Sequence, residues 1–485
     1  MYISSRVRGN VRALGIYTRG VFGAIALLAL AILAYNLMHL ATYIGDPASV
    51  MARFVAPLIV ASLMGLAFRL PLEASLMIAN VISAAVVSLY IGEFYLAWKL
   101  DHEQQAAAAR AGSTFDARTK LSVVRDLRAA GIDAYPIIRG RNLLSEDAQG
   151  RLLPLLSVGG TPLLPLTATP RTTVVSCNET GQWQVYETDR HGFNNPDALW
   201  DGPAPQIAMI GDSFAHGSCV SRDQNMESIL QRRFGPTLNL GVGGDGPLLE
   251  LAALTEYAEP MQPKIVLWAF FEGNDINADL PFELKAPILR SYLRDPRFGQ
   301  DLIHKDAIIS TALRSYLDRD LREAMDRVDD PTENFARYAS LDRVRSAVGL
   351  GPIEIGFNGG DLGEELEVFD QVMVSARDRV SGWGGKLYLV YLPDSDRYLS
   401  RFGFGTVRQT IYSGVQDTAR RHSIPMIDVA SAFARHAAPA DLFVYPGSHY
   451  NPAGYALAAQ TIATALDRDH ALPGTVRPPL ASRDP

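Results

Sequence analysis

Ser213 is the residue of this chain best placed to act as a nucleophile. It follows the apolar run 207–210 and the turn residues Gly211 and Asp212. An apolar run of this length that ends at glycine is typical of a buried strand in a parallel sheet. Open α/β sheets hold their ligands at the carboxyl ends of the strands, so a serine at that point is positioned to react. The same residues also form ordinary turns and helix N-caps, and the motif alone leaves both interpretations open.

Three later stretches supply the groups that such a serine needs. Gly244 lies in a glycine-rich stretch after a predicted strand, and Asn274 directly follows the apolar run 265–271. His449 precedes a helix that is expected to begin at Pro452. A histidine can take the proton of a serine hydroxyl. Backbone and side-chain amides can stabilise the negative charge that develops on a carbonyl oxygen during acyl transfer.

The order Ser, Gly, Asn and His, each at the end of a strand or the start of a helix, resembles the SGNH (GDSL-type) hydrolase superfamily. The resemblance covers roughly residues 200–465. It implies Ser213 as nucleophile, His449 as catalytic histidine, and an oxyanion hole formed by the backbone N–H groups of Ser213 and Gly244 and the side-chain amide of Asn274. The family pattern places this glycine five residues after a strand-ending asparagine, which is Asn239 in this sequence.

The sequence departs from the family in the acid of the triad. Family members usually carry an aspartate two or three residues before the histidine, where this chain has Gly447 and Pro446. The acid normally fixes the imidazole tautomer and stabilises the imidazolium. Asp441 is the nearest acid before His449. A Ser–His dyad, a carboxylate from Asp441, and a backbone carbonyl near Pro446 that orients the ring all remain open.

Three residues outside the four motifs bear on the site. Cys177 and Cys219 are the only cysteines of the chain. If the domain lies outside the cytoplasm, they can form a disulfide that ties the preceding segment to the active-site loop, and two isolated thiols are the equal alternative. His216, one helical turn after Ser213, is expected at a partly exposed helix position, with a pocket-lining role as the alternative.

The sequence gives no support for a cofactor or a metal. Gly241, Gly243 and Gly246 satisfy the G-x-G-x-x-G pattern of dinucleotide-binding folds. That interpretation leaves the serine and histidine motifs unexplained. The chain has no Cys-x-x-Cys and no His-Glu-x-x-His motif. We therefore expect no cofactor and no metal ligands.

Composition indicates a membrane protein with more than one domain. The 485 residues are 48% hydrophobic and 20% charged, and the mean hydropathy is +0.04. This length exceeds that of one typical domain. The net charge is −7 and the pI is near 5.8, which argue against a nucleic-acid partner.

Three apolar runs at 21–43, 54–68 and 74–91 predict about three transmembrane helices. Four arginines and no acids precede the first run, which places the N-terminus in the cytoplasm. Three spans then put everything after Trp98 in the periplasm or the exterior. Two spans would leave the catalytic domain in the cytoplasm, so the topology depends on the short second run. We expect the chain in the cytoplasmic (inner) membrane.

The predicted domain order follows from these patterns. Residues 1–100 form the membrane region, 101–199 a helical stalk and an irregular segment, 200–467 the hydrolase domain and 468–485 a tail. A helical insert at 277–384 is interpreted as a lid over the site. Strands alternating with helices imply a three-layer α/β/α sandwich around a parallel sheet. The expected strands are 207–210, 238–240, 265–271, 387–391 and 425–427, and the expected helices are 223–234, 248–258, 407–421 and 452–466.

These features predict a membrane-anchored serine esterase or deacylase that acts on O-acyl esters. The substrate is an acylated small molecule or an envelope or extracellular glycan, and the glycan is inferred from location alone. One alternative is an O-acyltransferase of polysaccharide modification, which would need an acyl-supplying membrane partner. The other is a non-catalytic glycan-binding protein on a hydrolase fold. Covalent labelling of Ser213 separates the first two from the third.

Overall fold

The computed structural model describes residues 5–38, 51–326, 341, 343–344, 362–399 and 405–472. Their elements fall into two compact units, and each is described by itself. The first unit consists mainly of the N-terminal residues up to Lys99. The second unit holds most of the remaining residues, including a five-stranded sheet and the helices that pack on it.

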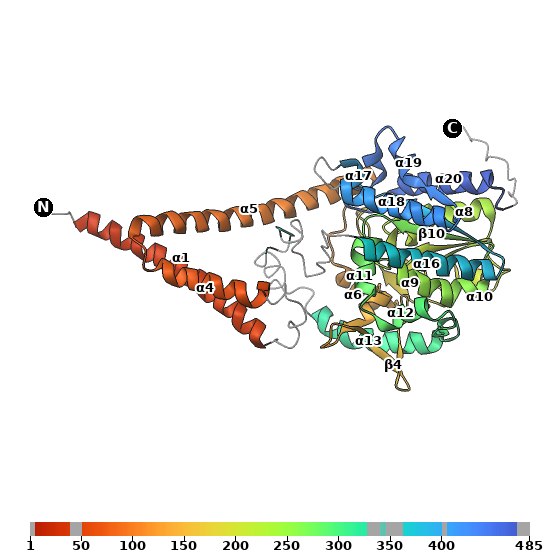
Figure 1. Cartoon of the computed structure of the whole chain (residues 1–485), viewed down its shortest axis with the longest axis horizontal. Helices are drawn as coiled ribbons and strands as arrows, with labels where there is room; N and C mark the ends of the chain where they lie inside the picture. Colours follow the sequence, from red (N-terminus) through yellow and green to blue (C-terminus); the bar gives the residue numbers. More distant parts are fainter. Residues whose placement is uncertain are drawn as a thin grey trace. The chain divides into compact units, whose positions relative to one another are not determined.

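The first unit contains two helices that are long and apolar enough to cross a membrane (Figure 1). They are α1 (Ser5–Met38) and α5 (Leu72–Arg110). The run expected as the second span forms η1 (Met51–Val55) and α4 (Ala56–Ala67), which packs along α1. With 12 residues, α4 covers about 18 Å, against about 30 Å of hydrocarbon. The prediction of three spans therefore depends on the shortest of the three helices.

The third expected span and the stalk are not separate elements. The helix α5 continues without a break from the apolar run to Arg110, and a second helix, α6 (Lys120–Ala129), follows it. The segment expected as a helical stalk therefore holds the end of α5 and all of α6, with a break in the helix between them.

The second unit is built on a five-stranded parallel sheet of order β12-β11-β10-β8-β9. Every strand pair in it is parallel, and Gly211 of β8 pairs with Ala269 of β10. All five strands predicted from the sequence are present, with bounds shifted by two residues at most. They are β8 (Ile207–Gly211), β9 (Thr237–Asn239), β10 (Ile265–Phe271), β11 (Lys386–Leu392) and β12 (Met426–Asp428).

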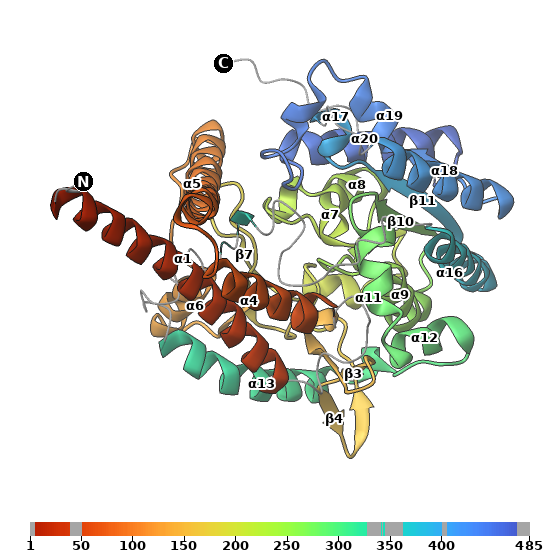
Figure 2. The ribbon, with the colours of Figure 1, turned by 60° about the vertical axis from the view of Figure 1, so that its left-hand side comes forward.

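Helices cover both faces of this sheet and complete the three-layer sandwich that the sequence predicts (Figure 2). Alternate residues of β10 bury on opposite faces, Trp268 in one core cluster and Leu267 in the other. Against the Trp268 face lie α9 (Pro247–Ala253), α16 (Gly363–Gly382) and α18 (Gly405–Arg421). Against the Leu267 face lie α8 (Met226–Phe234), α19 (Val429–Ala434) and α20 (Pro452–Arg468).

The described part of the insert extends this core instead of forming a separate lid. The helix α16 packs on β11 as the crossover between β10 and β11. The buried residues of the earlier helices join the same cluster as α9. These elements are η6 (Asp275–Asp279), α11 (Leu280–Glu283), α12 (Pro287–Arg294), η7 (Leu302–His304) and α13 (Asp306–Asp326). Most of 327–361 lies outside the described residues, and a lid there stays a prediction.

The segment before β8, expected to be irregular, carries short strands. A mixed sheet of order β1-β6-β7 has β7 at one edge. Its strands are β1 (Ala134–Pro136), β6 (Thr173–Val175) and β7 (Val185–Glu187). Between them lie η2 (Gly140–Leu143), β2 (Leu144–Glu146), β3 (Leu152–Pro154), and the hairpin of β4 (Leu156–Val158) and β5 (Thr161–Leu163).

Candidate active site

Ser213 is the first residue of the short helix α7 (Ser213–His216), directly after β8. Asp212 caps this helix by accepting a hydrogen bond from the Phe214 backbone N–H at 2.8 Å. Gly211 has φ +154°, and a Cβ there would lie 2.6 Å from the Ala269 carbonyl oxygen. Only glycine fits this approach of two strands, so the sharp turn that presents Ser213 is a consequence of the local sequence.

The sequence-predicted pair Ser213 and His449 meets at hydrogen-bond distance. The Ser213 Oγ lies 2.8 Å from His449 Nε2. The other ring nitrogen, Nδ1, lies 3.0 Å from both carboxylate oxygens of Glu179. Glu179 Oε2 also accepts the backbone N–H of His449 at 2.8 Å. Serine, imidazole and carboxylate thus form one continuous chain of hydrogen bonds, the arrangement that activates a hydroxyl.

The carboxylate in this chain is neither of the groups proposed from the sequence. Asp441 lies in η8 (Pro439–Leu442), and its backbone carbonyl accepts from the Asn451 side chain at 2.6 Å. No hydrogen bond joins the Asp441 carboxylate to His449 among the described residues. The dyad and the carbonyl-oriented ring are also wrong, because Glu179 occupies Nδ1 of His449. Glu179 lies far upstream of the four motifs, in the segment before β7.

A disulfide between Cys177 and Cys219 places Glu179 at the histidine. The two Cα atoms are 5.0 Å apart, and Cys219 lies in the loop after α7. Thr180 Oγ1 donates to the Cys219 carbonyl at 3.0 Å, so a second bond holds the same junction. Glu179 lies between the anchored residues Cys177 and Thr180. The cysteine pair was the signal in the sequence that could have pointed to this segment.

The three proposed oxyanion donors come from neighbouring strand ends. Ser213 follows β8, and the Gly244 loop follows β9, which pairs with β8. A Cβ on Gly241 would lie 2.4 Å from the His216 backbone nitrogen, so this loop packs directly on α7. Asn274 follows β10, which pairs with β8 on its other side. Parallel strands end at one edge of a sheet, so the fold brings these groups to the same edge.

Gly244 and Asn274 each have a local feature that bears on the proposed oxyanion hole. Gly244 has φ +77°, a conformation that disfavours other residues, and its carbonyl accepts from Arg141 Nη1 at 3.0 Å. The Asn274 Oδ1 atom is buried and has no hydrogen-bond partner among the described residues. This oxygen can only accept hydrogen bonds, so the proposed contact with the oxyanion depends on the amide N–H of the same side chain.

His216 is buried, and the expectation of a partly exposed helix position is wrong. Its Nε2 lies 2.7 Å from the Tyr186 hydroxyl and its Nδ1 3.2 Å from Ser218 Oγ. Burial, with further contributions from Arg139 and His449, lowers its pKa to about 3. A neutral histidine with both nitrogens occupied supports the loop after α7, and His449 is left as the base.

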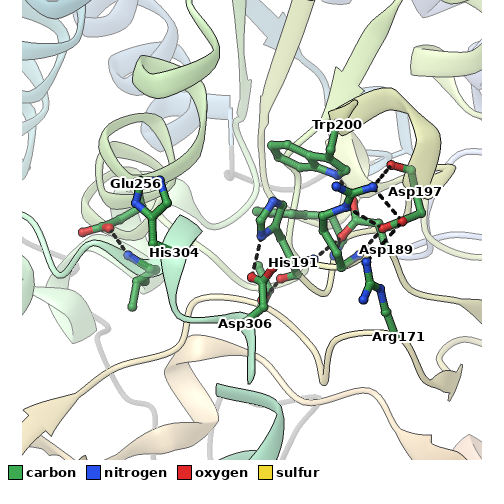
Figure 3. A network of polar contacts seen from close by, with 12 residues as sticks. Arg171, Asp189, His191, Asp197, Trp200, Glu256, His304 and Asp306 are labelled. Carbon is green, nitrogen blue, oxygen red and sulfur yellow. Dashed lines mark hydrogen bonds and ion pairs between the residues drawn. The ribbon is translucent and has the colours of Figure 1, made fainter. Parts of the chain in front are cut away.

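A second network of hydrogen bonds leads to the glycine loop, and Figure 3 shows two of its members, Asp189 and Trp200. Asp189 accepts hydrogen bonds from the Trp200 indole at 2.7 Å and the Asn195 side chain at 3.0 Å. Asn195 in turn bonds both the backbone N–H and the carbonyl of Asn239 at 2.9 Å. The Asn239 side chain then accepts from the Gly241 N–H at 2.9 Å. The strand-ending asparagine of the family pattern therefore has a physical role, because it fixes the start of the loop that holds Gly244.

The donor set beside His449 does not fit a resident metal. Cys177, Glu179, Cys219 and His449 offer ligand atoms within 4.8 Å of one another. Both sulfur atoms are consumed by the disulfide, and His449 Nδ1 is bonded to Glu179. A thiolate is the sulfur ligand that metals bind, so this group does not supply a coordination shell as it stands.

Comparison with known proteins adds structural likeness only. No family model and no curated protein matches the chain. Among solved structures, the chain is similar to a lipolytic protein of the G-D-S-L family from Desulfitobacterium hafniense, with 11% identity over 54% of this chain and 98% of that chain and a TM-score of 0.30. It is also similar to the lipase/acylhydrolase from Enterococcus faecalis, with 14% identity over 55% and 96% and a TM-score of 0.30. The first of these is described as a member of the G-D-S-L family and the second as a lipase/acylhydrolase, and the side chains of the site must carry the functional conclusion.

Proposed function

We propose that the chain is a serine hydrolase that cleaves O-acyl esters. The observation that supports this most directly is the continuous hydrogen bonding from Ser213 through His449 to Glu179. A serine hydroxyl is a poor nucleophile at neutral pH until a base takes its proton. The complete chain also argues against the non-catalytic glycan-binding alternative, whose main support was the missing acid.

The proposed reaction has two acyl-transfer steps. Ser213 Oγ attacks the ester carbonyl carbon while its proton passes to His449 Nε2, and Glu179 stabilises the imidazolium through Nδ1–H. The oxyanion accepts hydrogen bonds from the Ser213 and Gly244 N–H groups and the Asn274 amide. When the C–O bond breaks, the alcohol leaves with the proton from His449. Water then attacks the acyl-serine with His449 as base, which releases the acid and restores the hydroxyl.

We infer that this protein is anchored in the membrane and that its catalytic domain acts outside the cytoplasm. Two apolar helices fit a membrane anchor. Disulfides persist in oxidising compartments, and here one holds the segment that carries the triad acid. This location favours esters of envelope or extracellular glycans. Transfer to a sugar hydroxyl in place of water would use the same acyl-serine, so an acceptor must be included in the test.

The test is covalent labelling combined with turnover. Purified full-length protein should be labelled at Ser213 by a fluorophosphonate and should hydrolyse 4-nitrophenyl acetate. Ser213→Ala should abolish both signals. Addition of an oligosaccharide acceptor distinguishes hydrolysis from transfer by the appearance of an acylated sugar. A folded wild-type protein that neither labels nor turns over an ester, with or without acceptor, would contradict the proposal.

A further inference from the structure

Arg139 lies over the turn that carries the proposed oxyanion glycine. A Cβ on Gly243 would lie 3.1 Å from Arg139 Cζ, and one on Gly244 would lie 3.6 Å from Arg139 Nη1. The Arg139 Nε atom is buried without a hydrogen-bond partner. Within the part of the chain that the structure describes, the Arg139 side chain makes no hydrogen bond and no ion pair. A cation of this kind at the loop of the proposed oxyanion glycine is a candidate for contact with the substrate.

The neighbouring Arg141 provides a direct contrast. Its Nη1 donates to the Gly244 carbonyl at 3.0 Å and pairs with Asp279 at 2.6 Å. Gly140 between the two arginines is packed so closely that a Cβ would lie 3.2 Å from Leu249 Cδ2 and from the Pro165 carbonyl oxygen. The Arg-Gly-Arg turn is therefore fixed against the domain. Arg141 stabilises the glycine loop, whereas Arg139 is held at the same loop without a described bond of its own.

The acids near Arg139 form no ion pair with it among the described residues. Two acids, Asp245 and Asp212, favour the charged form of Arg139, and burial raises the pKa of both, that of Asp245 well above its usual range and that of Asp212 to about 6. Lys120 adds positive charge, because burial and the proximity of Arg139 lower its pKa to about 8. Burial is the largest influence on Arg139 and disfavours its charge, and a bound anion would offset that cost.

We propose that Arg139 binds an anionic group, a carboxylate or a phosphate, that the substrate carries next to the ester cleaved at Ser213. This inference rests on the proposed esterase function and adds the substrate class to it. The planar guanidinium matches the two oxygens of a carboxylate or phosphate and is already fixed in place. The carbonyl oxygen of the ester is expected at Gly244. The anionic group bound by Arg139 is therefore expected close to the ester bond, in either the acyl part or the alcohol part of the substrate.

Matched ester pairs that differ in one charge test this proposal. 4-Acetoxybenzoate against 4-acetoxybenzamide places the charge on the alcohol side. 4-Nitrophenyl hydrogen succinate against its methyl ester places it on the acyl side. Wild-type protein should prefer the charged member of one pair by about tenfold or more in kcat/KM, as expected for a bond to a charged group. In Arg139→Gln this ratio should fall to about one, and Arg139→Lys should retain part of it.

Arg468→Gln is the matched control, because Arg468 ends α20 about 24 Å along the helix from the His449 end. It should keep the wild-type ratio in both pairs. Thermal unfolding of each variant checks that it is folded. Calorimetry on Ser213→Ala gives a readout without catalysis, in which 4-hydroxybenzoate or succinate should bind more tightly than the corresponding amide or ester and lose this advantage with Arg139→Gln.

The outcomes separate the two proposals. Labelling and turnover of 4-nitrophenyl acetate without any charge preference would overturn the role of Arg139 and leave the esterase function standing. An undiminished charge preference in folded Arg139→Gln would overturn it as well. Selective anion binding by Ser213→Ala, with no labelling or turnover by the wild type, would support the anion site and contradict the esterase.

Discussion

Glu179 contacts His449 at both its backbone and its ring. One carboxylate oxygen accepts the backbone N–H at 2.8 Å, and both oxygens lie 3.0 Å from Nδ1. The bond to the backbone N–H holds the main chain of the loop at His449. The contacts with Nδ1 fix the orientation of the ring and its tautomer. A single side chain from a distant segment thus sets both the position and the tautomer of the proposed base.

Glu179→Gln should lower kcat/KM for a short-chain ester by about a hundredfold to ten-thousandfold, because an amide does not stabilise the imidazolium. The substitution keeps the shape and one acceptor, so stability should change little. Steady-state kinetics measure this effect. Asp441→Asn is the matched control and should stay within about twofold of the wild type. A larger effect of Asp441→Asn than of Glu179→Gln would contradict the assignment of the acid.

The disulfide should act on catalysis through Glu179. Replacing both Cys177 and Cys219 with serine should lower kcat/KM, because the segment that carries the carboxylate loses its covalent anchor. The same double replacement in a Glu179→Gln background should have little further effect, since the group it positions is already gone. Kinetics of the four proteins form a double-mutant cycle. Additive losses would show that the cysteines act on the site by another route.

The parts of the site that sequence reasoning located are those encoded locally. The strand 265–271 has the predicted bounds, and Ser213, Asn274 and His449 follow from the residues next to them. Turn glycines, apolar runs and caps act over a few residues, so their pattern is visible in the sequence. Strands and helices are also encoded locally, which is why their alternation along the sequence predicts the three-layer α/β/α sandwich.

The parts that were missed depend on contacts between distant segments. Nothing beside Glu179 marks it as an acid for a histidine 270 positions later in the chain. The burial of His216 comes from Tyr186 and the preceding sheet, which local polarity does not reveal. The cysteine pair was the only indication that this segment reaches the site, and the sequence left its pairing open. The sequence likewise did not single out Arg139, because only the folded structure shows that its side chain lies against Gly243.

Asn274→Ala should slow turnover by about a hundredfold or more, the usual loss for one oxyanion donor. The loss should appear in kcat, because the donor acts on charge that develops in the transition state. Fluorophosphonate labelling of Ser213 should persist, since the nucleophile and its base are unchanged. Unchanged kcat in the folded variant would remove Asn274 from the oxyanion hole.

The catalytic domain should lie outside the cytoplasm. With the arginine-rich N-terminus inside, two spans would return the chain to the cytoplasm, where disulfides are rare. We therefore expect the short run of η1 and α4 to complete a third crossing, with local thinning of the bilayer. A phosphatase fused after Gln105 should be active and a fluorescent protein fused there dark. Fluorescence at that position would contradict this topology.

The last prediction concerns Glu227, a buried carboxyl at the start of α8 that takes no part in the proposed chemistry. Burial raises its pKa to about 7, against the opposing effect of a hydrogen bond from Ser228. An acid with a raised pKa in the folded state carries no penalty below its unfolded pKa of about 4.5. It destabilises the protein increasingly as pH rises from there through about 7.

Glu227→Gln should therefore raise the free energy of unfolding at pH 8 by on the order of 3 kcal/mol and leave it nearly unchanged at pH 4. The amide has the same shape and cannot ionise, so the pH dependence of the difference isolates the buried charge. Denaturant unfolding at several pH values measures it. Glu187→Gln, at an exposed position of β7, is the control. It should not change the free energy of unfolding in this pH-dependent way. An equal shift at both pH values would mean that packing, and not ionisation of Glu227, produces the effect.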